Sequence, residues 1–254
     1  MKCLACGLLL FSLSAPTLNA GPILGSASSF AVLGASTVTS TDLTVLWGNL
    51  GVGPGTSITG FPPGIVHGTI YDGDAVADQA EADALTAYNT LVKLPSDYNL
   101  TGEDLGGLTL LPGVYTFNSS AQLTGQLLLN MEGDCNARFV FVIGSTLTTA
   151  SGASVITTNG TSCGNVYWVL GSSATIGSTT NFLGNILADA SITLNTGANI
   201  ADGSALALTG AVTLDDNEIS LGLSGVPEPG TVALVSAGLF GLGLLRRTSR
   251  KRAT

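Results

Sequence analysis

The chain has 254 residues and a formal net charge of −9; only 10% of the residues are charged, whereas 45% are hydrophobic and 34 are glycine. Such a chain is too apolar to be disordered, because disorder requires low hydrophobicity together with high net charge. Residues 21–225 contain 16 acidic and 2 basic residues, a net charge of −14, and a surface of that sign repels the phosphate backbone of nucleic acids. Nucleic acid is therefore excluded as a partner.

Residues 1–20 are typical of a secretory signal peptide. Lys2 provides a positive charge, an apolar run covers residues 4–13, and Leu-Asn-Ala at residues 18–20 forms a suitable cleavage site. We therefore expect an exported chain whose mature domain covers residues 21–225.

The mature domain is dominated by short runs with period 2, separated by Gly, Asn, Asp and Ser, which predicts strands and turns. One pattern recurs in these runs: a small or polar residue, an aliphatic residue, then another small or hydroxyl-bearing residue. Its copies are residues 37–39, 57–59, 122–124, 146–148, 175–177, 191–193 and 211–213. Longer apolar strands are expected at residues 139–143, 166–170, 182–187 and 205–208.

Alternation along a strand turns the aliphatic residue of each copy inward and its neighbours outward. In the C-terminal half the copies recur at intervals close to one coil of a solenoid. The pattern therefore predicts an all-β fold, a three-sided β-solenoid. The alternative is a β-sandwich whose exposed faces are rich in threonine, because threonine favours strands in any fold.

One segment has helical instead of strand periodicity. Asp74 is a suitable N-cap, and Lys93 followed by Pro95 ends the segment. Its apolar positions are Val76, Ala80, Ala84, Tyr88, Leu91 and Val92. Because this face is rich in alanine, we expect an α-helix over about residues 74–93 that lies close against a sheet.

Cys135 and Cys163 are the two cysteines of the mature domain. Disulfides persist in exported proteins, so we expect these two to be bonded, which stabilises the fold by roughly 3–4 kcal/mol for a loop of about 28 residues. A metal site needs more ligands than two cysteines and the single His67 supply. No metal is expected.

Ordered motifs along residues 24–221 resemble those of the DUF3494 ice-binding protein family. They are found at residues 24–33, 48–52, 58–64, 111–115, 139–141, 144–148, 184–188 and 210–215. The resemblance implies a discontinuous β-solenoid of triangular cross-section with one α-helix along a side. It also implies adsorption to an ice crystal surface through one flat face, the activity of an antifreeze-type protein.

A ladder of outward hydroxyl groups offers a physical basis for such adsorption. Equivalent positions on successive coils lie ~4.7–4.9 Å apart, and alternate residues of one strand ~6.6–6.8 Å apart, a grid that can order water to match ice. Threonine suits this role because its branched side chain has few rotamers. The expected ice-binding residues are Thr37, Thr39, Ser57, Thr59, Thr124, Thr146, Thr148, Thr175, Thr193 and Thr213, with interruptions at Gln122, Gly177 and Ala211. The alternatives are a rival face containing Ser154, Asn181 and Asn199, with residues 196–199 at its edge, and a plain soluble β surface.

The C-terminal segment, residues 226–254, begins with Val-Pro-Glu-Pro-Gly, continues with fifteen uncharged residues at 231–245, and ends in a basic tail. Fifteen residues fall short of the ~20 that span a bilayer upright, but the basic tail fits the positive-inside rule. The trio resembles the PEP-CTERM sorting signal of Gram-negative bacteria, with Pro227, Glu228 and Pro229 as its motif.

The PEP-CTERM resemblance implies transient anchoring in the inner membrane, the chain's only membrane contact, through a transmembrane segment at about 231–245. Exosortase then cleaves near the motif, and the product reaches the cell surface or extracellular matrix. A plain C-terminal membrane anchor is the alternative.

Catalytic motifs are absent from the sequence. There is no Gly-x-Ser-x-Gly elbow, no phosphate-binding loop and no His-Glu-x-x-His pattern. The carboxylate pairs lie in turns and at a helix start, where aspartate favours capping. We therefore expect neither an enzyme nor a cofactor. The alternative function is a non-catalytic matrix or adhesion protein associated with exopolysaccharide, for which Trp47 and Trp168 are the available stacking residues; Trp168 lies in an apolar run typical of a core.

Overall fold

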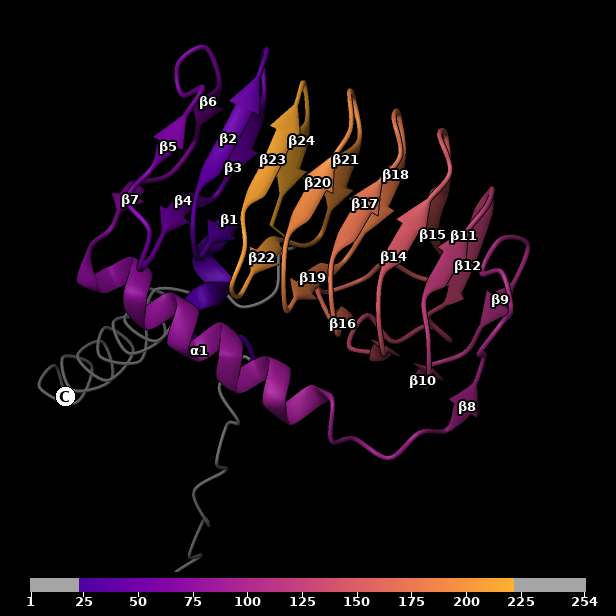
Figure 1. Cartoon of the computed structure of the whole chain (residues 1–254). Coiled ribbons are helices and arrows are strands. Elements are labelled where there is room, and N and C mark those ends of the chain that lie inside the picture. Colours follow the sequence, from indigo (N-terminus) through magenta and orange to yellow (C-terminus); the bar gives the residue numbers. More distant parts are fainter. Residues whose placement is uncertain (1–22, 222–254) are drawn as a thin grey trace, which may run out of the picture.

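The computed structural model describes residues 23–221, which form three sheets of parallel strands around one interior (Figure 1). Sheet A has the spatial order β7 (Ile70–Asp72), β4 (Asn49–Val52), β1 (Phe30–Gly34), β22 (Ala205–Ala207), β19 (Asn185–Ala188), β16 (Val166–Leu170), β13 (Phe139–Ile143), β10 (Gly113–Phe117) and β8 (Tyr98–Asn99). Sheet B has the order β11 (Ala121–Leu123), β14 (Leu147–Thr149), β17 (Ala174–Ile176), β20 (Ile192–Leu194), β23 (Val212–Asp215), β2 (Val38–Thr41) and β5 (Ile58–Thr59). Sheet C has the order β6 (Ile65–Val66), β3 (Val45–Trp47), β24 (Glu218–Ser220), β21 (Asn199–Ala201), β18 (Asn181–Leu183), β15 (Ser154–Thr158), β12 (Gln126–Asn130) and β9 (Thr109–Leu110).

Successive coils pass from sheet A to sheet B to sheet C, but their order in space differs from their order in the chain. β1 pairs with β22, β2 with β23 and β3 with β24, so the first coils stack on the last ones. The helix α1 (Ala75–Leu91) carries the chain along sheet A from the β7 end to the β8 end (Figure 1). The fold is thus the expected discontinuous three-sided β-solenoid with one helix, and not a β-sandwich.

One expected strand, residues 182–187, is two strands on different sheets. Gly184 lies between them with φ +106°, a left-handed conformation that glycine tolerates best, and turns the chain from β18 on sheet C to β19 on sheet A. The buried Asn185 holds this corner, because its Nδ2 donates to the carbonyl oxygens of Gly164 at 3.0 Å and Val166 at 3.2 Å. A continuous apolar run concealed the turn from sequence reasoning.

Stacked aromatic rings line the interior of sheet A. The ring centroids of Tyr115 and Phe141 lie 5.4 Å apart, and those of Phe141 and Trp168 lie 3.9 Å apart. The indole Nε1 of the fully buried Trp168 donates to the carbonyl of Leu183 on sheet C at 3.0 Å. Trp168 is therefore a core residue, as its apolar run predicts.

Helix α1 covers the outer surface of sheet A. Asp74 caps it as expected, its Oδ1 accepting from the backbone N–H groups of Val76 and Ala77 at 3.0 Å. The buried stripe consists of Ala77, Ala80, Ala84, Ala87 and Leu91. The expected stripe was partly wrong: Val76 and Val92 are 46% and 38% exposed, because small alanines occupy the positions that meet the sheet most closely.

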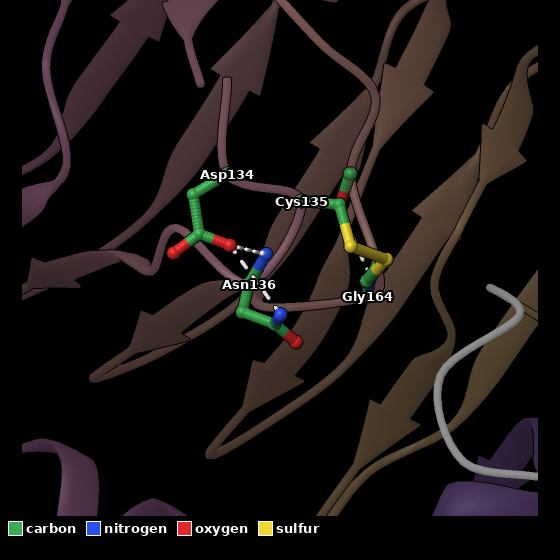
Figure 2. The surroundings of a disulfide bond; sticks show 6 residues. Asp134, Cys135, Asn136 and Gly164 are labelled. Carbon is green, nitrogen blue, oxygen red and sulfur yellow. Dashed lines mark hydrogen bonds between the residues drawn. A yellow bond between two sulfur atoms is a disulfide. The ribbon is translucent and has the colours of Figure 1, made fainter. Parts of the chain in front are cut away.

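The expected disulfide joins two neighbouring loops at the corner between sheets C and A (Figure 2). The Cα atoms of Cys135 and Cys163 lie 5.1 Å apart, and the N–H of Cys163 donates to the carbonyl of Cys135 at 2.9 Å. In the same loop, Oδ1 of Asp134 accepts from the N–H of Asn136 at 2.8 Å. The bond thus ties the loop after β12 to the loop after β15.

The expected signal peptide and the sorting motif at Pro227, Glu228 and Pro229 lie outside the described residues, as does the segment at 231–245. Within residues 23–221, no helix combines the length and the apolar character needed to cross a membrane.

Candidate functional site

Sheet B turns a continuous row of side chains outward, which we call the central row. The strand pairing aligns its members in the order Gln122, Thr148, Thr175, Thr193, Thr213, Thr39 and Thr59. All seven are exposed or partly exposed. The alternate positions, such as Leu147, Ile192 and Val212, point into the core and are fully buried. Six threonines therefore occupy the same position on six adjacent strands.

A second row of small side chains, most of them with a hydroxyl group, lies two residues before the central row; we call it the flanking row. Its members are Ser120, Thr146, Ser173, Ser191, Ala211, Thr37 and Ser57. Part of its hydrogen-bonding capacity joins neighbouring coils: Thr146 Oγ1 donates to Ser120 Oγ at 2.9 Å, and Ser191 Oγ accepts from the N–H of Ala211 at 3.2 Å. The flanking row is therefore more constrained than the central row.

Nine of the ten expected residues lie in these two rows, and Thr124 does not. Thr124 falls in a third row with Ala150, Gly177 and Asn195. In most copies of the repeated pattern the last residue enters the central row, but in residues 122–124 and 175–177 the first residue does. The pattern is thus shifted by two residues in these copies, which moves Thr124 out of the central row and places the buried Gly177 in the same third row.

Three hydroxyl residues of the flanking row, Ser120, Ser173 and Ser191, were not among the expected ice-binding residues, although the repeated pattern already turned Ser191 outward. Each lies two residues before a member of the central row. Period-2 alternation alone would have found them once the central row was known.

Charged side chains are excluded from the two rows and lie at their borders. Asp104 pairs beside Gln122 at one end of sheet B, where its Oδ1 accepts from the N–H groups of Gly106 at 2.7 Å and Thr124 at 2.9 Å. Partial burial raises the pKa of Asp104, but these hydrogen bonds outweigh it and lower the pKa below its usual value. The carboxylate thus stays charged at the edge and leaves the rows neutral.

The rival row on sheet C is aligned by strand pairing but varies in chemistry. Ser154, Asn181 and Asn199 lie side by side as expected, and the row continues through Glu218 to Val45 and Ile65. The next row of sheet C contains Leu128, Ile156, Leu183, Ala201, Ser220, Trp47 and His67, of which Leu183 is buried. With sheet A covered by α1, sheet B is the uncovered face that repeats one side chain.

Two family profiles match the chain. The family described as Ice-binding-like matches residues 32–220, and the PEP-CTERM protein-sorting motif matches residues 225–247. An ice-binding protein of Nostoc sp. (strain HG1) is 56% identical over 228 residues, which cover 87% of this chain and 84% of that protein. Ice-binding protein 1 of Shewanella frigidimarina is 33% identical over 207 residues, which cover 69% of this chain and 23% of that protein.

Solved structures share the fold. The ice-binding protein from the Antarctic ascomycete Antarctomyces psychrotrophicus superposes with a TM-score of 0.75 at 42% identity, covering 78% of this chain and 97% of its own. The DUF3494 domain of Shewanella frigidimarina ice-binding protein 1 gives a TM-score of 0.73 at 31% identity, covering 78% and 96%. The match thus extends over nearly the whole of each solved domain.

Proposed function

The chain belongs to the ice-binding-like family, and on this premise we propose that it is an exported ice-binding protein that adsorbs to ice through the central and flanking rows of sheet B. The observation that carries the proposal is the run of threonines at Thr148, Thr175, Thr193, Thr213, Thr39 and Thr59. Strand propensity favours threonine at each of these positions, but it does not require the same side chain on six adjacent strands.

The mechanism follows from the spacing and stiffness of these side chains. Strand neighbours lie ~4.7–4.9 Å apart, and each threonine presents a methyl group and a hydroxyl group in few rotamers. The hydroxyls anchor water while the methyl groups limit its other orientations, so that the hydration layer merges with the lattice of ice. Adsorbed molecules pin the ice front, and the curved ice between them grows less readily. Inhibition of ice growth or recrystallisation results.

Residues 225–247 match the PEP-CTERM motif, a sorting motif for surface-associated secretion in Gram-negative bacteria. Export follows from this match. We propose that residues 1–20 are removed as a signal peptide and that residues 231–245 hold the chain transiently in the inner membrane. Exosortase then cleaves near Pro227, Glu228 and Pro229. The mature protein is delivered to the cell surface or extracellular matrix, where it meets external ice.

The family is named for adsorption to ice, a function without catalysis, and we propose that this chain is no enzyme and uses no cofactor. The alternative role, a matrix or adhesion protein that contacts exopolysaccharide, has support at one place. Trp47 on sheet C is 47% exposed, so an aromatic ring is available for stacking on a sugar. This second role is compatible with ice binding, because the two sheets are separate sides of the solenoid.

The proposal is tested with a protein of residues 21–225. Solved relatives consist almost wholly of this domain, and its hydrophobic core lies within residues 23–221, so it folds by itself. We expect thermal hysteresis and inhibition of ice recrystallisation. Thr193→Tyr should abolish both, because the larger ring interrupts the middle of the central row.

The matched control is Asn181→Tyr, which adds the same ring to the rival row on sheet C. It should leave both activities unchanged, with circular dichroism showing that each variant is folded. Loss of activity in Asn181→Tyr with full activity in Thr193→Tyr would move the ice-binding site to sheet C. A folded but inactive wild type would leave the matrix or adhesion role as the better one.

A further inference from the structure

Trp47 lies on the outer surface of sheet C between an aromatic and an acidic neighbour. The indole ring stacks on the imidazole of His67, with centroids 3.9 Å apart and planes inclined by 12°. Its Nε1 donates to Oε1 of Glu218 at 2.9 Å. The ring is thus held in one orientation from two sides while almost half of the residue stays exposed.

The register of sheet C defines what lies on the other side of this ring. Trp47 has His67 beside it, directly after β6, and Ser220 beside it on β24, with Ala201 one strand further. Because His67 covers one face of the indole, the opposite face points away from β6, toward the side of the sheet on which Ser220 and Ala201 follow. Both residues are small, so the indole ring of Trp47 stands higher than the surface beside it.

Polar side chains lie on the same two strands as Ser220 and Ala201. The carboxylate of Glu218 uses Oε1 for the indole, and Oδ1 of Asn199 accepts from the N–H of Glu218 at 2.8 Å. Among the hydrogen bonds of residues 23–221, the second Glu218 oxygen, Asn199 Nδ2 and the Ser220 hydroxyl have no partner. Two acceptors and two donors therefore lie unused on β24 and β21, the two strands that follow Trp47 in sheet C.

We propose that these six residues, Trp47, His67, Glu218, Ser220, Ala201 and Asn199, form a binding site for a neutral pyranose polysaccharide. We call it the Trp47 site. A pyranose ring presents C–H groups on one face and hydroxyls around its edge, which matches an aromatic wall with a polar border. The sugar ring stacks on the free face of Trp47, and its hydroxyls bond to Glu218, Asn199 and Ser220.

The negative charge of the surface favours a neutral sugar over an acidic one. Residues 21–225 carry a net charge of −14, and Glu218 lies within the site, so a uronate or sulfated chain is repelled. Sheets B and C are different sides of the solenoid, so the site can bind a polysaccharide while the central row contacts ice. The inference rests on the proposed export to the surface or matrix but not on ice binding.

The test uses residues 21–225 and cellohexaose, a neutral β-linked glucan. The protein has two tryptophans, and Trp168 is fully buried, so a change in fluorescence reports on Trp47. We expect a saturable blue shift of the emission. By calorimetry, Trp47→Ala should weaken binding by about tenfold or more, whereas Trp47→Phe should retain part of it.

Two control variants separate the site from the rest of the molecule. Ile156→Ala changes an exposed apolar residue in the same row of sheet C, four strands from Trp47, and should bind cellohexaose like the wild type. Thr193→Tyr should lose ice activity and keep sugar binding. Failure of this proposal is thus distinguishable from failure of the ice-binding proposal.

Several results would overturn the Trp47 site. The first is that cellohexaose, laminarin and dextran all fail to change the fluorescence or to give heat. Equal affinity of the wild type and Trp47→Ala is another, and binding of alginate as tight as that of cellohexaose would exclude the neutral specificity. A dimer in light scattering that Trp47→Ala dissociates would assign this surface to a second copy of the chain instead.

Discussion

Sheets B and C are built by the same coils and bury comparable apolar rows, yet their outer surfaces differ. Sheet B repeats threonine on six adjacent strands, whereas the rival row of sheet C changes from Ser154 through Asn199 and Glu218 to Ile65. Folding constrains the inward positions of both sheets equally and leaves the outward ones free. The repetition on sheet B therefore suits the proposed ligand, ice, which itself repeats, and the local cluster on sheet C suits a ligand bound at one place.

The activities of sheets B and C should be independent of sheet A. Glu81 on α1, the helix that covers sheet A, tests this independence, and its substitution has the largest expected effect. Burial, and to a smaller extent the neighbouring Asp78 carboxylate, raises the pKa of Glu81 from 4.5 to about 8, and its Oε1 lacks a hydrogen-bond partner within residues 23–221. Because the pKa is higher in the folded state, stability is fully present below pH 4.5 and is lost as pH rises through 8. At about 1.4 kcal/mol per pH unit, the loss is roughly 5 kcal/mol at most.

Urea unfolding of the wild type at about pH 5 and about pH 9 measures this loss. Glu81→Gln should remove most of the difference, whereas Glu103→Gln, at an exposed carboxylate, should preserve it. Ice activity of the folded protein should not depend on pH in this range, because α1 lies on sheet A. Equal stability of the wild type at both pH values would show that the Glu81 carboxyl is hydrated in the folded protein.

Removal of the disulfide should destabilise the protein at the corner between sheets C and A without changing the outer surface of sheet B. Replacing both Cys135 and Cys163 with serine should lower the free energy of unfolding by about 3–4 kcal/mol and the melting temperature by about 6–16 °C. Because the bond lies at the corner between sheets C and A, thermal hysteresis near the freezing point should be unchanged.

Calorimetry and ice assays on the same samples check the disulfide prediction. Asn136→Ala changes an exposed side chain of the same loop and serves as the control, with little effect on either quantity. Loss of ice activity in a folded protein without the disulfide would mean that the bond maintains the geometry of sheet B.

The smallest expected effect concerns the position of a substituted threonine along the central row. Thr59 lies on the edge strand β5, whereas Thr193 lies on β20 with threonine-bearing strands on both sides. We expect Thr59→Tyr to retain most of the thermal hysteresis that Thr193→Tyr abolishes, because an edge substitution leaves the remaining row continuous. Equal losses would indicate that the edge strand is essential to the contact with ice.

Sequence reasoning succeeded where the evidence is local. The inward and outward alternation around Val38, Leu147 and Ile192 follows from period 2, and the cap at Asp74 follows from helix chemistry. It failed where two local patterns overlap, as at Gly184, whose turn lies inside an apolar run. It also failed at Thr124, because alternation defines the side of the sheet but not the row.

The sequence by itself determined the repeating strands and the helix, because each depends on neighbouring residues and on their period. The cysteine pair followed from the presence of two cysteines in an exported domain. Only the tertiary structure decided which residues share a row. Thr213 meets Thr39, 174 positions away in the chain, because β23 pairs with β2. This register depends on the number of residues in every corner between sheets and on the stacking of coils out of chain order. For the same reason, Trp47 could meet Glu218 only once the first coils had stacked on the last, whereas its contact with His67 joins two consecutive coils.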